Sequence, residues 1–78
     1  MYVYVIRSTV KPDEIYVGVA RDSLHRLQEH NEGLSHHTSK FRPWILEVTI
    51  WFADSKKAYP FERWLKTGSG RAFRNRHF

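Results

Sequence analysis

The stretch YVGVARDSLHRLQEHNEG, from Tyr16 to Gly33, decides the fold of this chain. It opens within Ile15–Ala20, which is rich in β-branched residues and predicts a strand. Asp22 follows, and its side-chain oxygen suits the N-cap of a helix. Ser23–Asn31 is predicted to form that helix, and Gly33 is placed to end it. A strand and a helix are therefore expected to follow each other directly.

On the N-terminal side of this stretch, Tyr2–Ser8 predicts another strand. Lys11–Glu14 is a turn signal, so the two strands are expected to pair as an antiparallel hairpin. Gly18, near the end of the second arm, permits close backbone approach or a bulge. On the C-terminal side, Leu34–Lys40 is polar and predicts a loop, and Ile45–Phe52 predicts the third strand.

In the C-terminal part, Asp54 or Ser55 could start a second helix, but a proline in a helix interior removes one hydrogen bond. The regular helix is therefore expected to begin close to Pro60, after a looser turn. Thr67–Gly70 is expected to end this helix, and Arg71–Phe78 reads as a basic tail with some helical character. The expected fold class is α/β of the α+β type, in one domain over residues 1–78. We expect a small three-stranded antiparallel sheet flanked by helices. The expected order of elements is β-β-α-β-α, with a short C-terminal helix as a possible addition.

The composition is basic and lacks cysteine. The chain has 78 residues, 13 Lys and Arg, 8 Asp and Glu, and a formal net charge of +5. This charge predicts an anionic partner, most simply nucleic acid, although solubility alone is an alternative. The N-terminal run is not typical of a signal peptide, and no apolar stretch is long enough to span a bilayer. A soluble, cytoplasmic protein without a membrane partner is expected.

Arg26 and His30 are the polar pair of the first predicted helix. They are four residues apart, so they project from the same side. Helical geometry places them on the flank of a stripe in which Leu24 and Leu27 face inward. The planar fork of an arginine suits a phosphate. The alternative is a solvated pair on an exposed flank.

Tyr4 and Tyr16 lie on adjacent strands of the predicted hairpin. Half-buried packing is one explanation of both, because tyrosine is common in strands. As general base, a phenol with an ordinary pKa of about 10 needs nearby positive charge. Arg26 or Arg21 could supply that charge.

Glu62 is the candidate metal ligand. It falls at the edge of an apolar stripe that includes Phe61 and Leu65. A lone carboxylate can hold a hydrated Mg²⁺ whose other ligands are water and substrate phosphate. The alternative is an ion pair with Lys66, four residues on.

Other features predict less specific roles. The three tryptophans are expected in the core or in a groove wall. His36 and His37 lack a third ligand at zinc spacing. Several basic residues could follow a phosphate backbone; they are Arg21, Lys40, Arg42, Arg71, Arg74 and Arg76.

In their order and spacing, these positions resemble the GIY-YIG endonuclease superfamily, and especially its small, stand-alone, UvrC nuclease-like members. Tyr2–Tyr4 stands where the family has Gly-Ile-Tyr, and Tyr16–Gly18 stands for Tyr-Ile-Gly. The string from Tyr16 to Gly33 is similar to the family signature, as are His37–Trp44 and Phe61–Lys66. The similarity covers nearly the whole chain.

The resemblance implies metal-dependent cutting of DNA phosphodiester bonds, in repair or recombination, with one divalent cation, Mg²⁺ or Mn²⁺, and no small-molecule cofactor. Tyr16 would be the general base, and Tyr4 would position the water or a metal-bound ligand. Arg26 would hold the scissile phosphate with support from His30, and Glu62 would anchor the cation.

Two positions depart from the family pattern. Many members carry a lysine or a polar residue where this chain has Val19. Many also complete the site with an asparagine, for which Asn75 is the candidate. A nucleic-acid-binding module with weak or no catalysis is therefore the alternative function, and a protein-binding subunit is a third.

Overall fold

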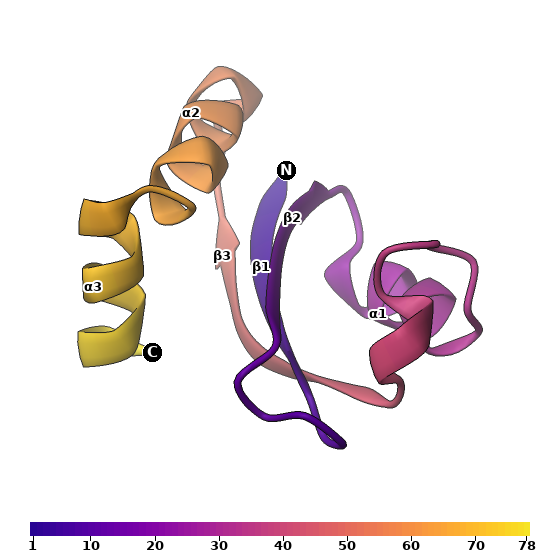
Figure 1. The fold of residues 1–78 in the computed structure, drawn as a ribbon. Helices are drawn as coiled ribbons and strands as arrows, with labels where there is room; N and C mark the ends of the chain where they lie inside the picture. The colour runs from indigo at the N-terminus through magenta and orange to yellow at the C-terminus, as the bar shows by residue number, and fades with distance from the viewer.

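The computed structural model describes all residues, 1–78, and confirms the predicted α+β class. Three strands form one antiparallel sheet in the order β2-β1-β3. One helix covers one face of this sheet, and two helices lie on the other side (Figure 1). The strands are β1 (Tyr2–Ser8), β2 (Ile15–Ala20) and β3 (Trp44–Trp51), and the helices are α1 (Ser23–Asn31), α2 (Ser55–Leu65) and α3 (Gly68–His77).

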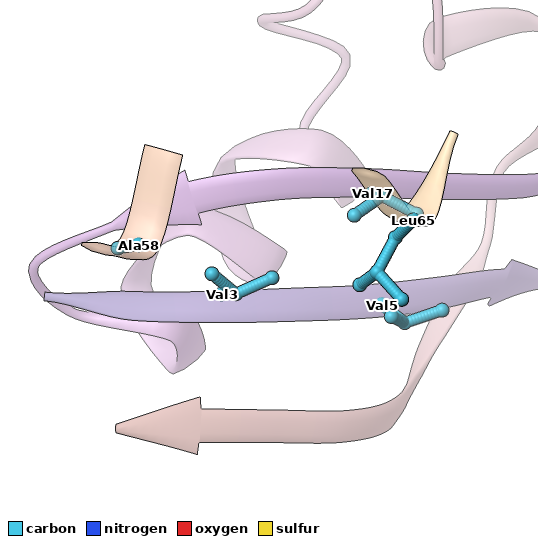
Figure 2. Packing of buried hydrophobic residues seen from close by; sticks show 5 residues of the cluster. All are labelled: Val3, Val5, Val17, Ala58 and Leu65. Atoms are coloured by element: carbon cyan, nitrogen blue, oxygen red, sulfur yellow. The ribbon is translucent and has the colours of Figure 1, made fainter. Parts of the chain in front are cut away.

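The central strand β1 is buried on both faces. Its side chains alternate between the faces, as strand geometry requires. Val3 and Val5 pack against the α2 side, where they meet Val17, Ala58 and Leu65 (Figure 2). The alternate side chains of β1 pack on the α1 side with other partners, namely Tyr4 and Ile6 with Trp44. The domain therefore has two apolar clusters that share one strand.

A β-bulge lets β3 contribute to both clusters. Val5 pairs with Val48 but Ile6 pairs with Leu46, so one extra residue lies between these two pairs on β3. Leu46 packs with the α1-side cluster and Val48 with the α2-side cluster. The extra residue, Glu47, is ion-paired with Arg7 at 2.5 Å.

Helix α1 has the predicted bounds and cap, but its orientation differs from the prediction. Asp22 accepts a hydrogen bond from the His25 amide at 3.1 Å, and Gly33 has a φ of 80° just after the helix end. Leu24 is 67% exposed, so the prediction that it faces inward was wrong. The inward stripe instead comprises Ser23, Arg26, Leu27 and His30. Its polar members are paired by other polar side chains, which is what makes their burial tolerable.

Helix α2 begins at Ser55, so the prediction of a start close to Pro60 was wrong. Asp54 caps the helix by accepting from the Lys56 amide at 2.9 Å. Pro60 leaves only the Lys56 carbonyl without its helical donor, and both residues are exposed, so water can replace that bond. Burial of apolar residues on the inward face then holds the helix against the sheet.

Helix α3 is longer than the predicted tail. The Thr67 side chain caps it by accepting from the Gly70 amide at 3.2 Å, so Thr67–Gly70 starts α3 as well as ending α2. A Cβ atom at Gly70 would lie 1.9 Å from the Trp64 carbonyl oxygen. A glycine is therefore required where α3 turns back against α2.

The remaining segments differ from the predictions in detail. Strand β3 starts and ends one residue earlier than predicted, and the polar loop ends in a short 3₁₀ turn at Ser39–Phe41. Only Trp44 of the three tryptophans is buried; Trp51 is 60% exposed and Trp64 is partly exposed. None of the helices has the length and apolarity that crossing a bilayer requires.

Candidate active site

Tyr4 lies at the centre of the candidate site, on the α1 face of the sheet. Its register partner on β2 is Gly18, and its ring crosses directly over that glycine. A Cβ atom at Gly18 would lie 2.5 Å from the Tyr4 hydroxyl oxygen. The absence of a side chain at Gly18 therefore determines where the Tyr4 hydroxyl can lie. This is the close approach that the sequence predicted for Gly18, with a tyrosine ring in place of backbone.

A buried hydrogen-bond chain runs from Tyr4 into the loop after α1. The Tyr4 hydroxyl is 2.9 Å from Nε2 of His30, and Nδ1 of His30 is 2.7 Å from the Thr38 hydroxyl. Thr38 donates its single proton to the Ser35 carbonyl at 3.4 Å. It must therefore accept from Nδ1–H of His30, which leaves Nε2 to accept from Tyr4. The network assigns a neutral His30 and a Tyr4 that donates its proton.

The electrostatics of the pair agree with this assignment. Burial, followed by the charge of Tyr16, raises the pKa of Tyr4 to about 12, although Arg26 opposes both effects. Burial, together with the positive charge of Arg26, lowers the pKa of His30. At neutral pH, Tyr4 keeps its proton and His30 stays uncharged. The alternative of a solvated histidine on an exposed flank is excluded, because His30 is fully buried.

Tyr16 is the more accessible of the two tyrosines. Its ring centroid lies 4.9 Å from that of His30 and 6.2 Å from that of Tyr4, so the three rings form one group. The side chain is half-buried, and its hydroxyl makes no hydrogen bond within the protein. A free hydroxyl at the surface of this group is available to a water molecule or a substrate.

Arg26 is the cation of the group. Its Nη1 atom is 3.3 Å from Glu29 one turn along α1, and its side chain is 35% exposed. Burial alone would lower the pKa of Arg26, but the interactions with Glu29 and with the Tyr4 hydroxyl outweigh it and raise that pKa. Arg26 is therefore a permanent positive charge beside Tyr4, with part of its fork open to solvent.

Glu62 lies on α2, and Lys66 connects it to the tyrosines. The Lys66 ammonium is 2.9 Å from Oε1 of Glu62 and 6.0 Å from the centroid of the Tyr16 ring. Because α2 covers the opposite face of the sheet, this ammonium reaches Tyr16 around the edge strand β2. The side chain of Glu62 is only 15% exposed. Glu62 therefore belongs to the same edge of the domain as Tyr16.

Glu62 fits a cation that retains most of its water. No cluster of three or more His, Asp or Glu side chains exists in the structure, so a cage made entirely of protein ligands is excluded. Only one oxygen of Glu62 is paired, and the other has no protein partner. A hydrated Mg²⁺ or Mn²⁺ needs just one or two carboxylates when substrate phosphate completes its shell.

The structure places the predicted DNA-contacting residues outside this group. Arg21 lines two open concavities at the end of the sheet, and Arg42 donates to the Ser39 carbonyl at 2.9 Å. Arg74 donates to the Leu65 carbonyl at 3.1 Å and lines a third concavity with Arg71 and Asn75. No hydrogen bond or ion pair links Asn75 to Glu62. Lys40 is exposed on the 3₁₀ turn, and Arg76 is exposed on α3.

Sequence reasoning missed two members of the site. Thr38 orients His30, and its carbonyl accepts from the Trp44 indole at 2.8 Å. The family resemblance of His37–Trp44 covers this residue but gives it no role, and its partners come from α1 and β3. Lys66 was considered only as an ion-pair partner of Glu62, and its approach to Tyr16 depends on how α2 meets β2.

Comparison with known proteins identifies the family of this chain. A family model described as the GIY-YIG catalytic domain matches residues 1–76. The chain belongs to the GIY-YIG family. Its GIY-YIG domain is 35% identical over 80 residues to the structure-specific endonuclease subunit SLX1 of Malassezia globosa. That match covers 95% of this chain but 18% of the relative, so the chain spans about a fifth of its length. No solved structure matches significantly. Membership in this family supports a nuclease.

Proposed function

We propose that this GIY-YIG domain is a divalent-metal-dependent endonuclease that hydrolyses DNA phosphodiester bonds. The observation that carries the proposal is the grouping of the Tyr4, Tyr16 and His30 rings, with Arg26 beside Tyr4 and with Glu62 reached through Lys66 at the same edge. Family membership supports the reaction class. The relative named as a structure-specific endonuclease subunit supports DNA of particular structure as the substrate, in repair or recombination.

The two tyrosines take different parts in this proposal. Tyr4 has a pKa of about 12 and its proton is committed to His30, so it orients groups and does not act as base. Tyr16 has a free hydroxyl, and the Lys66 ammonium lies 6.0 Å from the centroid of its ring. Tyr16 is therefore the candidate that accepts a proton from the attacking water.

Arg26 and Glu62 would stabilise the charge that develops during cutting. The open part of the Arg26 fork can bind the scissile phosphate, and its permanent charge offsets the extra negative charge of the transition state. Glu62 would hold the divalent cation, which acts as a Lewis acid toward the phosphate and the leaving oxygen. His30 and Thr38 keep Tyr4 in place.

A DNA-binding module without catalysis is the second candidate. It is favoured by Val19, an uncharged residue that packs against the α2-side cluster, and by the ammonium that already pairs with Glu62. The basic surface would be retained in such a module.

Nicking of supercoiled plasmid and cleavage of branched DNA, each with Mg²⁺, Mn²⁺ or EDTA, separate these functions. We expect cutting with metal only, and its loss in Glu62→Gln and Arg26→Ala with unchanged circular dichroism. Glu14→Gln, which removes an exposed carboxylate from the β1–β2 turn, is the matched control and should cut normally. Protein that shifts these substrates on a gel but never cuts them would establish the binding module instead.

A further inference from the structure

A second aromatic surface lies at the end of the sheet, outside the group around Tyr4. Trp51, the last residue of β3, is 60% exposed, the highest value of the three tryptophans. Its ring centroid is 5.0 Å from that of Tyr2, its register partner on β1. Tyr2 is half-buried and supports one side of the indole. An indole held by a neighbouring ring but left in water is typical of a contact surface.

Two open concavities meet at this aromatic pair, and Arg21 lines both. One has a volume of about 460 Å³ and is lined by Tyr2, Arg21, Leu24 and Thr49, among others. The other has a volume of about 390 Å³ and is bounded by Trp51, Arg21, Met1 and Ser55. Arg21 has no carboxylate partner in the structure, because Asp22 beside it caps α1. The surface thus combines flat rings with an unpaired cation.

This surface is on the same side of the sheet as the candidate active site. Tyr2 and Tyr4 are two residues apart on β1, so their Cα atoms are about 7 Å apart and their side chains share one face. The concavity beside Tyr2 is also bounded by Ser23, at the start of the helix that carries Arg26. Arg26 and the aromatic pair therefore lie on the same side of the sheet, from which one DNA molecule could contact both.

We propose that Trp51 and Tyr2, with Arg21, form a stacking site for an unpaired nucleotide of the DNA substrate. The inference rests on the proposed nuclease function and specifies its substrate as DNA that exposes single-stranded nucleotides near the cut. An aromatic ring can stack on any base, and an adjacent arginine holds the phosphate that links that base to the next. Bases inside a duplex cannot reach the indole, so the site selects unpaired ones.

The test measures binding in EDTA, where no cutting occurs. Fluorescence anisotropy compares a labelled single-stranded deoxyoligonucleotide with the same sequence as a blunt duplex. We expect Trp51→Ala to bind the single strand about tenfold more weakly, with a much smaller change for the duplex. Trp51→Phe should retain most of the affinity. Arg21→Ala should reduce the slope of log K against log salt by about one.

Trp64→Ala is the matched control, because Trp64 is also partly exposed but lies on α2 against Phe61 and Phe73. It should bind single strand like the wild type, and circular dichroism of each variant verifies folding. Equal single-strand affinity for Trp51→Ala and wild type would overturn the proposal, as would equal losses on single strand and duplex. Loss of self-association in Trp51→Ala, with unchanged DNA binding, would assign the surface to a protein partner. The binding assay does not depend on catalysis. If the domain never cuts DNA but Trp51→Ala still weakens single-strand binding, the nuclease function is refuted and the stacking site is not.

Discussion

The Tyr4 hydroxyl donates to Nε2 of His30 across 2.9 Å, between two side chains that are almost completely shielded from water. This bond joins the sheet to α1 at the centre of the candidate site. Because the acceptor of this bond is a titratable ring, the stability of the folded state depends on the protonation state of His30.

The first prediction concerns this pH dependence. Burial lowers the pKa of His30 in the folded state, whereas an unfolded histidine titrates near 6.5. The stability that neutral His30 contributes is therefore complete above about pH 6.5 and is lost as the pH falls through the lowered folded pKa. Urea unfolding at several pH values between about 5 and 8 should show this loss.

His30→Gln should be less stable than the wild type at neutral pH by about 1–3 kcal/mol, because the Tyr4–His30–Thr38 chain is broken. Its free energy of unfolding should then vary less with pH below about 6.5. His36→Gln, in the exposed loop, is the control and should keep the full pH dependence. If the His30 variant keeps that dependence as well, another group carries it.

A methyl group at Gly18 should displace Tyr4. Gly18→Ala places Cβ 2.5 Å from the hydroxyl oxygen, a contact that neither the strand nor the ring can accept without moving. We expect a loss of about 1–3 kcal/mol in thermal or urea unfolding, together with loss of cutting. In a Tyr4→Ala background the same change should have a much smaller effect on stability. Equal losses in both backgrounds would show that the strain is in the backbone of β2 and not at Tyr4.

Removal of the Lys66 ammonium should strengthen metal binding at Glu62. In Lys66→Met, a positive charge 2.9 Å from the carboxylate disappears, so a divalent cation no longer competes with it. We expect a several-fold lower dissociation constant for Mn²⁺, measured by electron paramagnetic resonance. Stability should change by only about 0.5 kcal/mol, as for other i,i+4 pairs. Lys57→Met on the same helix is the control; an equal effect there would indicate only a change in net charge.

Arg71 and Arg74 should behave differently although both are basic residues of α3. Arg71 makes no side-chain bond within the protein, so Arg71→Ala should weaken DNA binding and reduce its salt slope by about one without destabilising the fold. Arg74 donates to the Leu65 carbonyl, so Arg74→Ala should also reduce stability, by about 1 kcal/mol. Filter binding at several salt concentrations and thermal unfolding distinguish the two effects. An Arg71 variant with an unchanged salt slope would place the DNA elsewhere.

Local signals in the sequence were sufficient for most of the fold. Strands β1 and β2 and helix α1 have the predicted bounds because β-branched residues, the Asp22 cap and Gly33 act through the nearest backbone. The start of α2 was missed because the expectation that proline breaks a helix interior takes no account of whether the carbonyl that loses its donor is exposed to water. At Pro60 the orphaned carbonyl faces water, and burial elsewhere on the helix compensates.

The site was harder to predict because its contacts are long-range. Spacing could place Arg26 and His30 on one side of α1, but it could not show that this side is the buried one. The choice of Leu24 as an inward residue followed the hydrophobic pattern, which fails where polar side chains satisfy one another in the core. Thr38 and Lys66 meet their partners only once loop and helix are docked.

The polar inward stripe of α1 has a consequence for engineering this domain. Apolar substitutions that usually improve a helix–sheet contact would here replace Arg26 or His30 and erase the candidate site. Thermostable variants should therefore be sought in the apolar packing beneath α2 and α3, with Glu62 and Lys66 left unchanged. The apolar core beneath α2 and α3 is then open to variation, whereas the α1 side of the sheet is almost fixed.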